Sequence, residues 1–296
     1  MQHVPVLLNK CIELLDIKPD GVYVDATLGR GGHTRAILEK LTSGHVICFD
    51  RDPLATAGAD DPRVKVIHSN FRYMSDHLHE GIDGILFDLG VSSPQLDDAQ
   101  RGFSYHQDAR LDMRMDTTQQ LDAHIIVNAY SKEQLEQIIR DWGEERYAER
   151  IAYRIVKSRE RKPIDSTLEL VDIIKSALPA KALREPQHPA MRTFQAIRIA
   201  VNDEIGALHE GLDSAIASLN SNGRIAVISF HSLEDRLVKM TFQRYTSGCT
   251  CPRDFPACVC GFKPVLEIIT RRPIIADDSD LNRRARSAKL RAAMKL

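Results

Sequence analysis

A glycine-rich turn that follows a short apolar run has the residue types needed to bind a small ligand closely. Residues 22–25 read Val-Tyr-Val-Asp, and residues 34–41 place apolar side chains at helical spacing. The segment between them carries three glycines: Gly29, Gly31 and Gly32. Glycine lets the backbone turn tightly and come close to a bound molecule. The order strand, glycine turn, helix therefore predicts a ligand site at the start of the helix.

Two acidic residues indicate the kind of ligand. Asp25 ends the first apolar run, and Asp50 ends the next one. Asp50 lies about twenty residues beyond the first glycine, where a carboxylate meets ribose hydroxyls in nucleotide-binding units. Its position argues for an adenosine-type cofactor and against a turn that binds nothing. A phosphate-binding loop is excluded because no Gly-Lys-Ser/Thr follows the glycines.

The choice between adenosine cofactors depends on the glycine pattern and on charge. A dinucleotide site requires Gly-x-Gly-x-x-Gly, but Thr34 occupies the last position here. S-adenosylmethionine carries a cationic amino group and a sulfonium in place of phosphates, and a carboxylate such as Asp25 suits that charge. The sequence therefore favours S-adenosylmethionine over a dinucleotide.

A second candidate site follows the apolar run 82–88. Methyl transfer to an exocyclic base amine needs hydrogen-bond acceptors near the nitrogen, because the nitrogen lone pair is conjugated into the ring. A carboxylate at a strand end and backbone carbonyls fixed before a proline supply such acceptors. The alternative is an ordinary Ser-Ser-Pro turn. The candidate catalytic residues are Asp88, Ser92, Ser93 and Pro94.

Strand-like and helical patterns alternate through the first third of the chain, which predicts an α/β fold. From 107 to 207 only helical patterns appear, and strand-like runs then return. We expect a doubly wound, Rossmann-like sheet of the class I S-adenosylmethionine-dependent methyltransferase type, interrupted by an all-helical substrate domain. The predicted cofactor-binding domain is discontinuous, 1–106 and 208–296, and the predicted insert is 107–207. The expected strands lie at 22–25, 45–50, 64–68, 82–88, 224–230 and 265–270.

The composition is that of an ordinary globular protein, with 296 residues of which 43% are hydrophobic and 27% charged. No apolar stretch approaches membrane-spanning length, and the first residues lack a signal-like pattern, so we expect a cytoplasmic protein with no membrane partner. The net charge of −1 indicates no particular partner. Residues 281–296, however, hold six basic residues and no acidic one. Such a segment suits either a phosphate backbone or a solvated helix face.

Six segments, spread over nearly the whole chain, resemble the RsmH (MraW) family. The family consists of bacterial methyltransferases that transfer a methyl group from S-adenosylmethionine to N4 of a decoding-centre cytosine in 16S ribosomal RNA. The resemblance therefore implies 16S rRNA, or the small ribosomal subunit, as the partner. The segments are Asp-Ala-Thr-Leu-Gly-Arg-Gly-Gly-His at 25–33, Asp-Leu-Gly-Val-Ser-Ser-Pro-Gln-Leu-Asp at 88–97, Arg-Gly-Phe-Ser at 101–104, Leu-Asp-Met-Arg-Met-Asp at 111–116, His-Pro-Ala-Met-Arg-Thr-Phe-Gln-Ala-Ile-Arg at 188–198 and Ile-Ser-Phe-His-Ser-Leu-Glu-Asp-Arg at 228–236.

The resemblance also implies roles for single residues. The family lacks the Asn/Asp-Pro-Pro-Tyr/Phe signature of amino-methyltransferases, so the catalytic role of residues 92–95 is carried over by analogy. An RNA substrate needs phosphate clamps, for which three arginines of these segments are suited: Arg192, Arg198 and Arg236. The implied cofactor contacts are Gly31, Gly32 and His33 at the methionine part, Asp50 at the ribose and Phe71 at the adenine, with Asp88 and Gln95 completing the pocket.

Three histidines in the same segments have side chains that can take a proton near neutral pH. Each can also be a structural hydrogen-bond partner, which is the favoured interpretation for any one of them. A general base can be unnecessary, because a methylated N4 is acidic enough to lose its proton to water. These histidines are His33, His188 and His231.

Four of the six cysteines form two Cys-x-Cys pairs: Cys249, Cys251, Cys258 and Cys260. In a cytoplasmic chain this pattern favours a structural zinc site over disulfides, with free thiols as the open alternative. The other two cysteines, Cys11 and Cys48, lie in apolar runs and are expected in the core.

Three functions remain to be compared. The leading one is an S-adenosylmethionine-dependent N4-cytosine methyltransferase of 16S rRNA. A methyltransferase of a small metabolite or of DNA would share the cofactor half, but the long helical insert, the basic segment and the family-like segments argue against it. An RNA-binding or assembly protein with an inactive cofactor fold would bind the cofactor without turnover.

Overall fold

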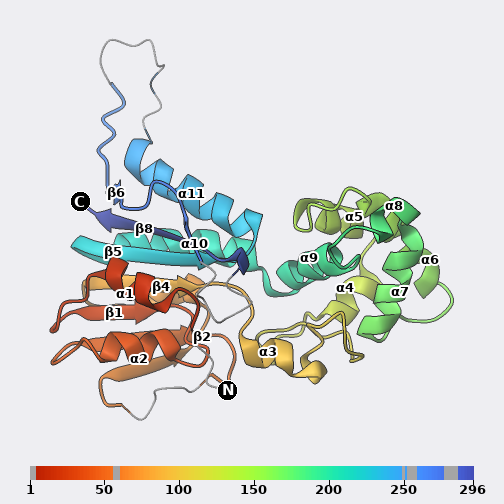
Figure 1. Cartoon of the computed structure of the whole chain (residues 1–296), viewed down its shortest axis with the longest axis horizontal. Helices are drawn as coiled ribbons and strands as arrows, with labels where there is room; N and C mark the ends of the chain where they lie inside the picture. Colours follow the sequence, from red (N-terminus) through yellow and green to blue (C-terminus); the bar gives the residue numbers. More distant parts are fainter. Residues whose placement is uncertain (1–4, 56–60, 249–250, 252–258, 277–285) are drawn as a thin grey trace. The chain divides into compact units, whose positions relative to one another are not determined.

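The computed structural model describes residues 5–55, 61–248, 251, 259–276 and 286–296, apart from the side chains of residues 93 and 94. The chain divides into two compact units (Figure 1). Unit 1 comprises Met1–Gly90 with Ile205–Leu296, and unit 2 comprises Val91–Glu204. No helix in the described part of the chain is both long enough and apolar enough to cross a membrane.

Unit 1 contains one mixed sheet of order β3-β2-β1-β4-β5-β8-β6, with β7 also paired to β8. The first five strands are parallel, whereas β8 is antiparallel to β5, β6 and β7. The predicted α/β class with a mostly parallel sheet is therefore confirmed. The strands are β1 (Val22–Asp25), β2 (His45–Asp50), β3 (Val64–His68), β4 (Ile82–Asp88), β5 (Leu219–Ser229), β6 (Leu266–Ile268), β7 (Ile274–Ile275) and β8 (Lys289–Lys295).

The direction of strand succession reverses between β1 and β4. From β1 the chain proceeds to β2 and β3 on one side, and then returns to place β4 on the other side of β1. In open parallel sheets, ligands bind at the carboxyl ends of the strands at such a point. The topology therefore directs attention to the segments that follow β1, β2 and β4.

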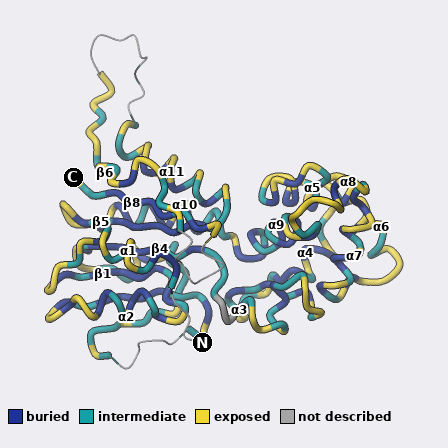
Figure 2. Tube along the Cα trace, viewed as in Figure 1, coloured by how far each residue is buried: buried dark blue, intermediate teal, exposed yellow. Residues whose placement is uncertain are grey.

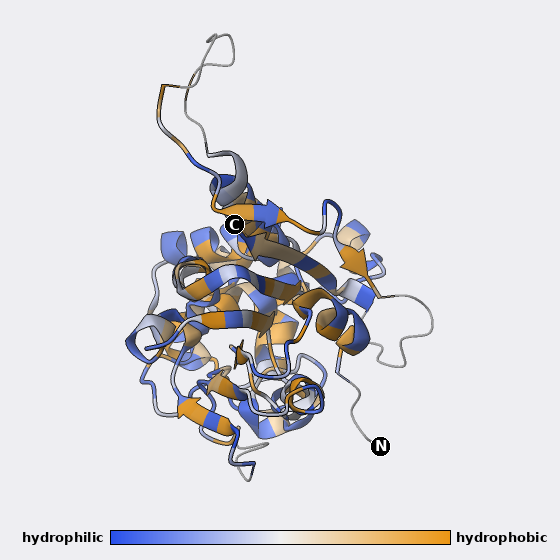
Figure 3. Cartoon of the chain, turned by 90° about the vertical axis from the view of Figure 1, so that its left-hand side faces the viewer, coloured by the Kyte–Doolittle hydropathy of each residue, from blue (hydrophilic) through white to orange (hydrophobic). Residues whose placement is uncertain are grey.

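Helices cover both faces of this sheet. Helices α1 (Leu8–Leu15) and α2 (Gly32–Leu38) pack on one face, and α10 (Glu204–Ser218) and α11 (Ser232–Ser247) pack on the other, where η1 (Phe71–Asp76) joins them. Strand β4 alternates accordingly, because Leu86 belongs to the first apolar layer and its neighbours Ile85 and Phe87 belong to the second. Figure 3 shows hydrophobic residues, coloured orange, in the strands of the sheet.

Unit 2 is helical, with one isolated β-bridge between Arg110 and Ser166 among its described residues. Its helices share a single apolar core. Three of the described α-helix starts have side-chain caps: Asp122 accepts from the Ile125 backbone, Ser131 forms a capping box with Gln134, and Ser166 accepts from the Glu169 backbone. The elements are α3 (Ser93–Asp97), η2 (Ala99–Arg101), α4 (Ala123–Ala129), α5 (Lys132–Asp141), α6 (Ala148–Arg159), α7 (Thr167–Ala177), α8 (Ala180–Leu183) and α9 (Met191–Asn202).

The first boundary of the helical unit lies earlier than the predicted start at residue 107. Residues 91–106 belong with the helices. Phe103 is buried in the helical core, and Arg101 donates from Nη2 to the carbonyls of Arg114 (3.0 Å) and Met115 (2.9 Å). These contacts tie the segment after β4 to unit 2, although its sequence shows no helical period.

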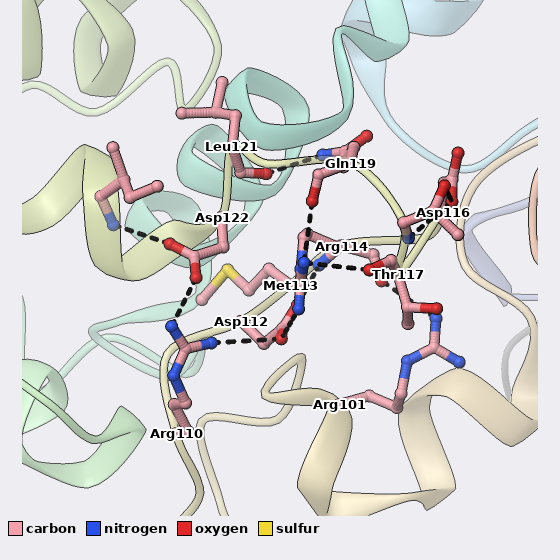
Figure 4. Close-up of polar contacts among 12 residues, drawn as sticks. Arg101, Arg110, Asp112, Met113, Arg114, Asp116, Thr117, Gln119, Leu121 and Asp122 are labelled. Carbon is pink, nitrogen blue, oxygen red and sulfur yellow. Dashed lines mark hydrogen bonds and ion pairs between the residues drawn. The ribbon is translucent and has the colours of Figure 1, made fainter.

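A network of ion pairs fixes the loop that contains the 111–116 segment (Figure 4). Arg114 donates from Nε and Nη2 to the two carboxylate oxygens of Asp112, at 2.8 and 2.7 Å. Arg110 lies between Asp112 and Asp122, and its Nη2 is 2.6 Å from the Asp122 carboxylate. Such charge-assisted pairs give the loop a defined conformation without helix or strand.

The expectation of a solvated helix face for the basic segment 281–296 is wrong, because three of its cations lie in the strand β8. Its suitability for a phosphate backbone stays a prediction. Arg291, which is 9% exposed, donates from Nε to Asp235 of α11 at 2.7 Å, and Lys289 reaches the same carboxylate at 3.2 Å. Lys295 donates to the Ile216 and Ala217 carbonyls. These side chains are held by the protein itself, whereas Arg283 and Arg284 lie outside the described residues.

Candidate functional site

The turn between β1 and α2 has the tight conformation that the glycines predicted. Gly29 and Gly31 adopt positive φ values of 51° and 66°, which disfavour other residues. Gly32 is required for a different reason, because a Cβ there would lie 2.3 Å from Cγ of Pro5. The turn thus brings bare backbone to the carboxyl end of β1.

Asp25 stabilises this turn through hydrogen bonds. Its carboxyl group is 1% exposed and accepts hydrogen bonds from the Thr27 backbone (3.1 Å) and the Thr34 hydroxyl (2.6 Å). Burial raises its pKa, against the opposing effect of these hydrogen bonds. The contacts of Asp25 in the structure are therefore with the loop, and a direct contact with a cationic ligand remains a prediction.

Asp50 joins the end of β2 to the same turn. One carboxylate oxygen accepts from Gly29 N and the other from Asp52 N, both at 2.8 Å. Each oxygen keeps a second lone pair, so the group can still accept from a diol. Burial raises the pKa of Asp50, and the charges of Asp52 and Asp25 raise it further.

Asp88 ends β4 and has the least satisfied carboxylate of the three. Its Oδ1 is buried, and no described residue places a hydrogen-bond donor within reach of it. Its Oδ2 lies 3.7 Å from Nδ1 of His33, whose Nε2 is 3.1 Å from the Val6 carbonyl. Burial raises the pKa of Asp88 to about 6; the charge of His33 opposes this shift, and Asp25 and Glu234 add to it.

These three carboxyl groups follow neighbouring strands and disfavour one another's ionisation. Asp25 raises the pKa of both Asp50 and Asp88. A cationic ligand at the carboxyl ends of the strands would relieve this repulsion and supply a partner for Asp88 Oδ1. The site therefore fits a positively charged cofactor with a ribose better than it fits a pyrophosphate.

Phe71, the predicted adenine neighbour, begins η1 after β3. Its ring packs edge-on against Phe87, with ring centroids 5.3 Å apart, and it is only partly buried. Gly211 on α10 makes room for the ring, since a Cβ at that position would lie 2.6 Å from Phe71 Cδ2. The glycine that fixes this ring has no signal in the sequence around the cofactor motifs.

The predicted residues after β4 belong to unit 2. Gln95 is buried, and its Oε1 accepts from Ser92 N at 2.9 Å, which closes the first turn of α3. Ser93 and Pro94 start that helix, and their side chains lie outside the description. The catalytic role of Ser92, Ser93 and Pro94 and the cofactor role of Gln95 therefore remain predictions.

The three predicted phosphate clamps differ in availability. Arg198, 17% exposed, donates from Nε and Nη2 to both carboxylate oxygens of Glu204, at 2.8 and 2.9 Å. Arg192 lies 3.9 Å from the Glu145 carboxylate, and Arg236 is exposed on α11. Arg198 is thus engaged within its own unit, which residue type and segment did not indicate.

The structure supports the structural interpretation of two histidines. His231 caps α11 through a capping box with buried Glu234, which also accepts from Phe230 N at 2.8 Å. His188 accepts from Ala190 N and stacks on Tyr105, with ring centroids 4.6 Å apart. Burial lowers the pKa of His188.

The cysteines divide as expected between core and loop. Cys11 and Cys48 are buried, and burial raises the pKa of both thiols, that of Cys48 to about 12. Cys251 is partly exposed and Cys260 is exposed. The other two predicted zinc ligands, Cys249 and Cys258, lie outside the described residues.

Comparison with known proteins gives matches along the whole chain. The family model described as the MraW methylase family matches residues 1–296. A ribosomal RNA small subunit methyltransferase H from Heliobacterium modesticaldum is 52% identical, covering 99% of this chain and 98% of the relative. Its namesake from Symbiobacterium thermophilum is 50% identical, with 99% and 96% covered.

Similarity to solved structures is much weaker. A putative methyltransferase from Streptococcus mutans in complex with SAH is 11% identical, with a TM-score of 0.43 over 99% of this chain and 100% of that one.

The raised pKa of the partly buried Asp88 carboxyl group predicts a pH-dependent stability. Its pKa is about 6 in the folded protein and about 4 when unfolded, so its stabilising contribution is present below about pH 4 and is lost as the pH rises through 6. We expect Asp88→Asn to raise the free energy of unfolding by about 1–3 kcal/mol at pH 7.5 and by much less at pH 4.5. Urea unfolding without ligand at both pH values measures this. The same difference at both would contradict the raised pKa.

Proposed function

Because this chain belongs to the MraW methylase family, we propose that it transfers a methyl group from S-adenosylmethionine to the RNA of the small ribosomal subunit. The single observation that carries the cofactor half is the cluster of Asp25, Asp50 and Asp88 around the glycine turn, with the Asp88 Oδ1 lacking a donor among the described residues. The RNA half rests on the relatives, which are ribosomal RNA small subunit methyltransferases.

Different residues of unit 1 would contact different parts of the cofactor. Asp50 would accept from the ribose hydroxyls with the lone pairs that Gly29 and Asp52 leave unused. Phe71 would border the adenine, and Gly31, Gly32 and His33 the methionine part. When bound, S-adenosylmethionine supplies a methyl group on a positively charged sulfur.

Asp88 would serve the transfer step. We propose N4 of a cytosine as the methyl acceptor. The lone pair of this amine is conjugated into the ring, so its methylation needs hydrogen-bond acceptors near the nitrogen. Above about pH 6 the Asp88 carboxylate is ionised and can accept a hydrogen bond from the amine, which draws the nitrogen lone pair out of the ring. Ser92, Ser93 and Pro94 would add acceptors after the same strand. The proton leaves N4 for water.

The test of this function is methyl transfer to small ribosomal subunits from a strain that lacks the activity. With labelled S-adenosylmethionine, the wild type should label one cytosine of the rRNA. Asp88→Asn should lower kcat about 100-fold, because it removes the charge of the acceptor. Asp83→Asn is the matched control, since Asp83 lies at the amino end of β4 and accepts from Val22 N.

Each outcome of this assay separates one alternative. Label in DNA or in a metabolite, but not in RNA, would support the second enzymatic function. Cofactor binding without any label would support a non-enzymatic RNA-binding or assembly protein.

Asp50 offers a separate test of cofactor binding. Asp50→Ala should weaken S-adenosylmethionine binding by about 1.5–3 kcal/mol, because it removes a charge-assisted acceptor for the ribose and releases Gly29 N. Isothermal titration calorimetry gives the dissociation constant. Asp83→Ala, which also frees a backbone N–H, should leave that constant unchanged. Equal losses in both variants would mean that Asp50 acts only through stability.

A structural zinc at Cys249, Cys251, Cys258 and Cys260 remains a separate proposal with no part in methyl transfer. The two described thiols leave it open, since both are accessible to a metal. We expect one zinc per chain in purified protein after loosely bound ions are removed, and Cys251→Ser with Cys260→Ser should abolish it. Metal analysis that finds no zinc in the wild type would refute the proposal.

A further inference from the structure

The exposed face of α6 has a composition that packing does not explain. The helix buries Ile151, Ala152 and Ile155 against the core of unit 2. At 100° per residue, the opposite side of the helix carries four residues, all exposed: Arg150, Tyr153, Arg154 and Lys157. Arg161, just beyond the helix end, continues the same line and is exposed as well. We call these five residues the α6 face; Figure 2 shows α6 coloured by the burial of its residues.

The arginines of the α6 face lack ionic partners within the described part of the chain. No carboxylate there lies within 4 Å of Arg150, Arg154 or Arg161, while Lys157 pairs with Glu160 at 2.7 Å. Several other exposed cations of unit 2 are paired, such as Lys162 with Glu169, Arg146 with Glu185 and Arg140 with Glu136. Three more are exposed and, within the described part of the chain, have no carboxylate within 4 Å: Lys175, Lys181 and Arg184. What distinguishes the α6 face is that three arginines without such a partner follow one line along a single helix.

This spacing of like charges works against the helix. Arg150 and Arg154 are four residues apart, as are Lys157 and Arg161, and Arg154 and Lys157 are three apart. Like charges at these separations are neighbours on a helix and destabilise it. The nearest acids in sequence, Glu149 and Glu160, lie toward one side of the face, and Glu149 is 3.6 Å from Lys132 of α5. Apart from the Lys157–Glu160 pair, no contact in the described part of the chain offsets this repulsion, whereas an external polyanion would neutralise it.

An aromatic side chain lies among these cations. Tyr153 is 55% exposed and belongs to no apolar cluster. Arginines around an exposed aromatic ring are the combination with which proteins hold single-stranded nucleic acid, because the cations contact phosphates and a base stacks on the ring. Arg150 and Lys157 are about 10 Å apart along the helix axis, enough to contact successive phosphates.

We propose that the α6 face binds the phosphate backbone of the RNA substrate, with Tyr153 as a stacking site for one unpaired base. The inference rests on the proposed function, since it names a surface by which unit 2 would hold the RNA. The proposal adds residues that do not belong to the glycine turn, to the Asp88 segment or to the three predicted phosphate clamps.

The salt dependence of RNA binding tests the charged part of the proposal. The triple variant Arg150→Gln/Arg154→Gln/Arg161→Gln is compared with Lys10→Gln/Lys40→Gln/Lys65→Gln, which also removes three exposed positive charges, but from unit 1. With an rRNA fragment that contains the methylated cytosine, each lost phosphate contact should lower the log–log salt slope by about 0.7–0.9. We expect a slope about 2 lower for the α6 variant and an unchanged slope for the control. Equal slopes and affinities would overturn the proposal.

Tyr153 provides a test that does not depend on charge. Tyr153→Ala should weaken binding of a single-stranded fragment about tenfold with an unchanged salt slope, and Tyr153→Phe should bind like the wild type. Unfolding curves that match the wild type show that the helix is intact. Unchanged binding by Tyr153→Ala would remove the stacking site from the proposal.

Methyl-transfer kinetics distinguish failure of this inference from failure of the proposed function. The α6 variant should raise KM for the small subunit about tenfold, with the effect in KM rather than in kcat, and the cofactor dissociation constant should stay the same. If the wild type methylates rRNA and the α6 variant has the same KM, only the α6 proposal fails. If the wild type methylates nothing, the proposed function fails, and the salt slopes still decide the α6 proposal. If the α6 variant binds anionic phospholipid vesicles less well than the wild type but binds RNA equally well, the α6 face binds membranes and the RNA proposal is wrong.

Discussion

The hydrogen bond from Gly29 N to the Asp50 carboxylate is the contact on which the arrangement of unit 1 depends most directly. It joins the end of β2 to the turn after β1, while Asp25 fastens the other side of that turn through Thr27 and Thr34. Thr27 in turn accepts from Asp88 N at 2.7 Å, so the ends of β1, β2 and β4 form one hydrogen-bonded edge. Carboxyl groups placed so close in a buried edge carry a cost that a cationic ligand reduces.

The parts of this design that depend on local pattern were predictable. Apolar alternation, glycines that need positive φ and a carboxylate at a strand end are features of consecutive residues. They predicted six strands, the turn and the positions of Asp25, Asp50 and Asp88, but they did not predict β7 and β8. The helical character of the insert was predictable for the same reason, since Ser131 and Ser166 mark helix starts.

Long-range pairing of charges was not predictable. The sequence predicts Arg198 as a phosphate clamp, but in the structure it is paired with Glu204. The two residues lie on either side of Asp203, where α9 ends with a φ of 46°. Arg291 and Lys289 read as a basic tail, yet Asp235 on α11 accepts from both, because β8 lies between β5 and β6. Phe71 depends on the absence of a side chain at Gly211. In each case the partner comes from another element, and spacing along the chain says nothing about it.

The pairing of β4 with β5 has a consequence for how the chain assembles. Asp88 pairs with Ile228, and the whole of unit 2 lies between them in sequence. Closing so long a loop costs chain entropy before any strand contact is gained, and such non-local contacts slow folding. Unit 2 is continuous and has its own core, so its prior collapse would draw the two ends of the intervening chain nearer and shorten the search for register. Unit 2 would then promote formation of the sheet whose strands precede and follow it in the sequence.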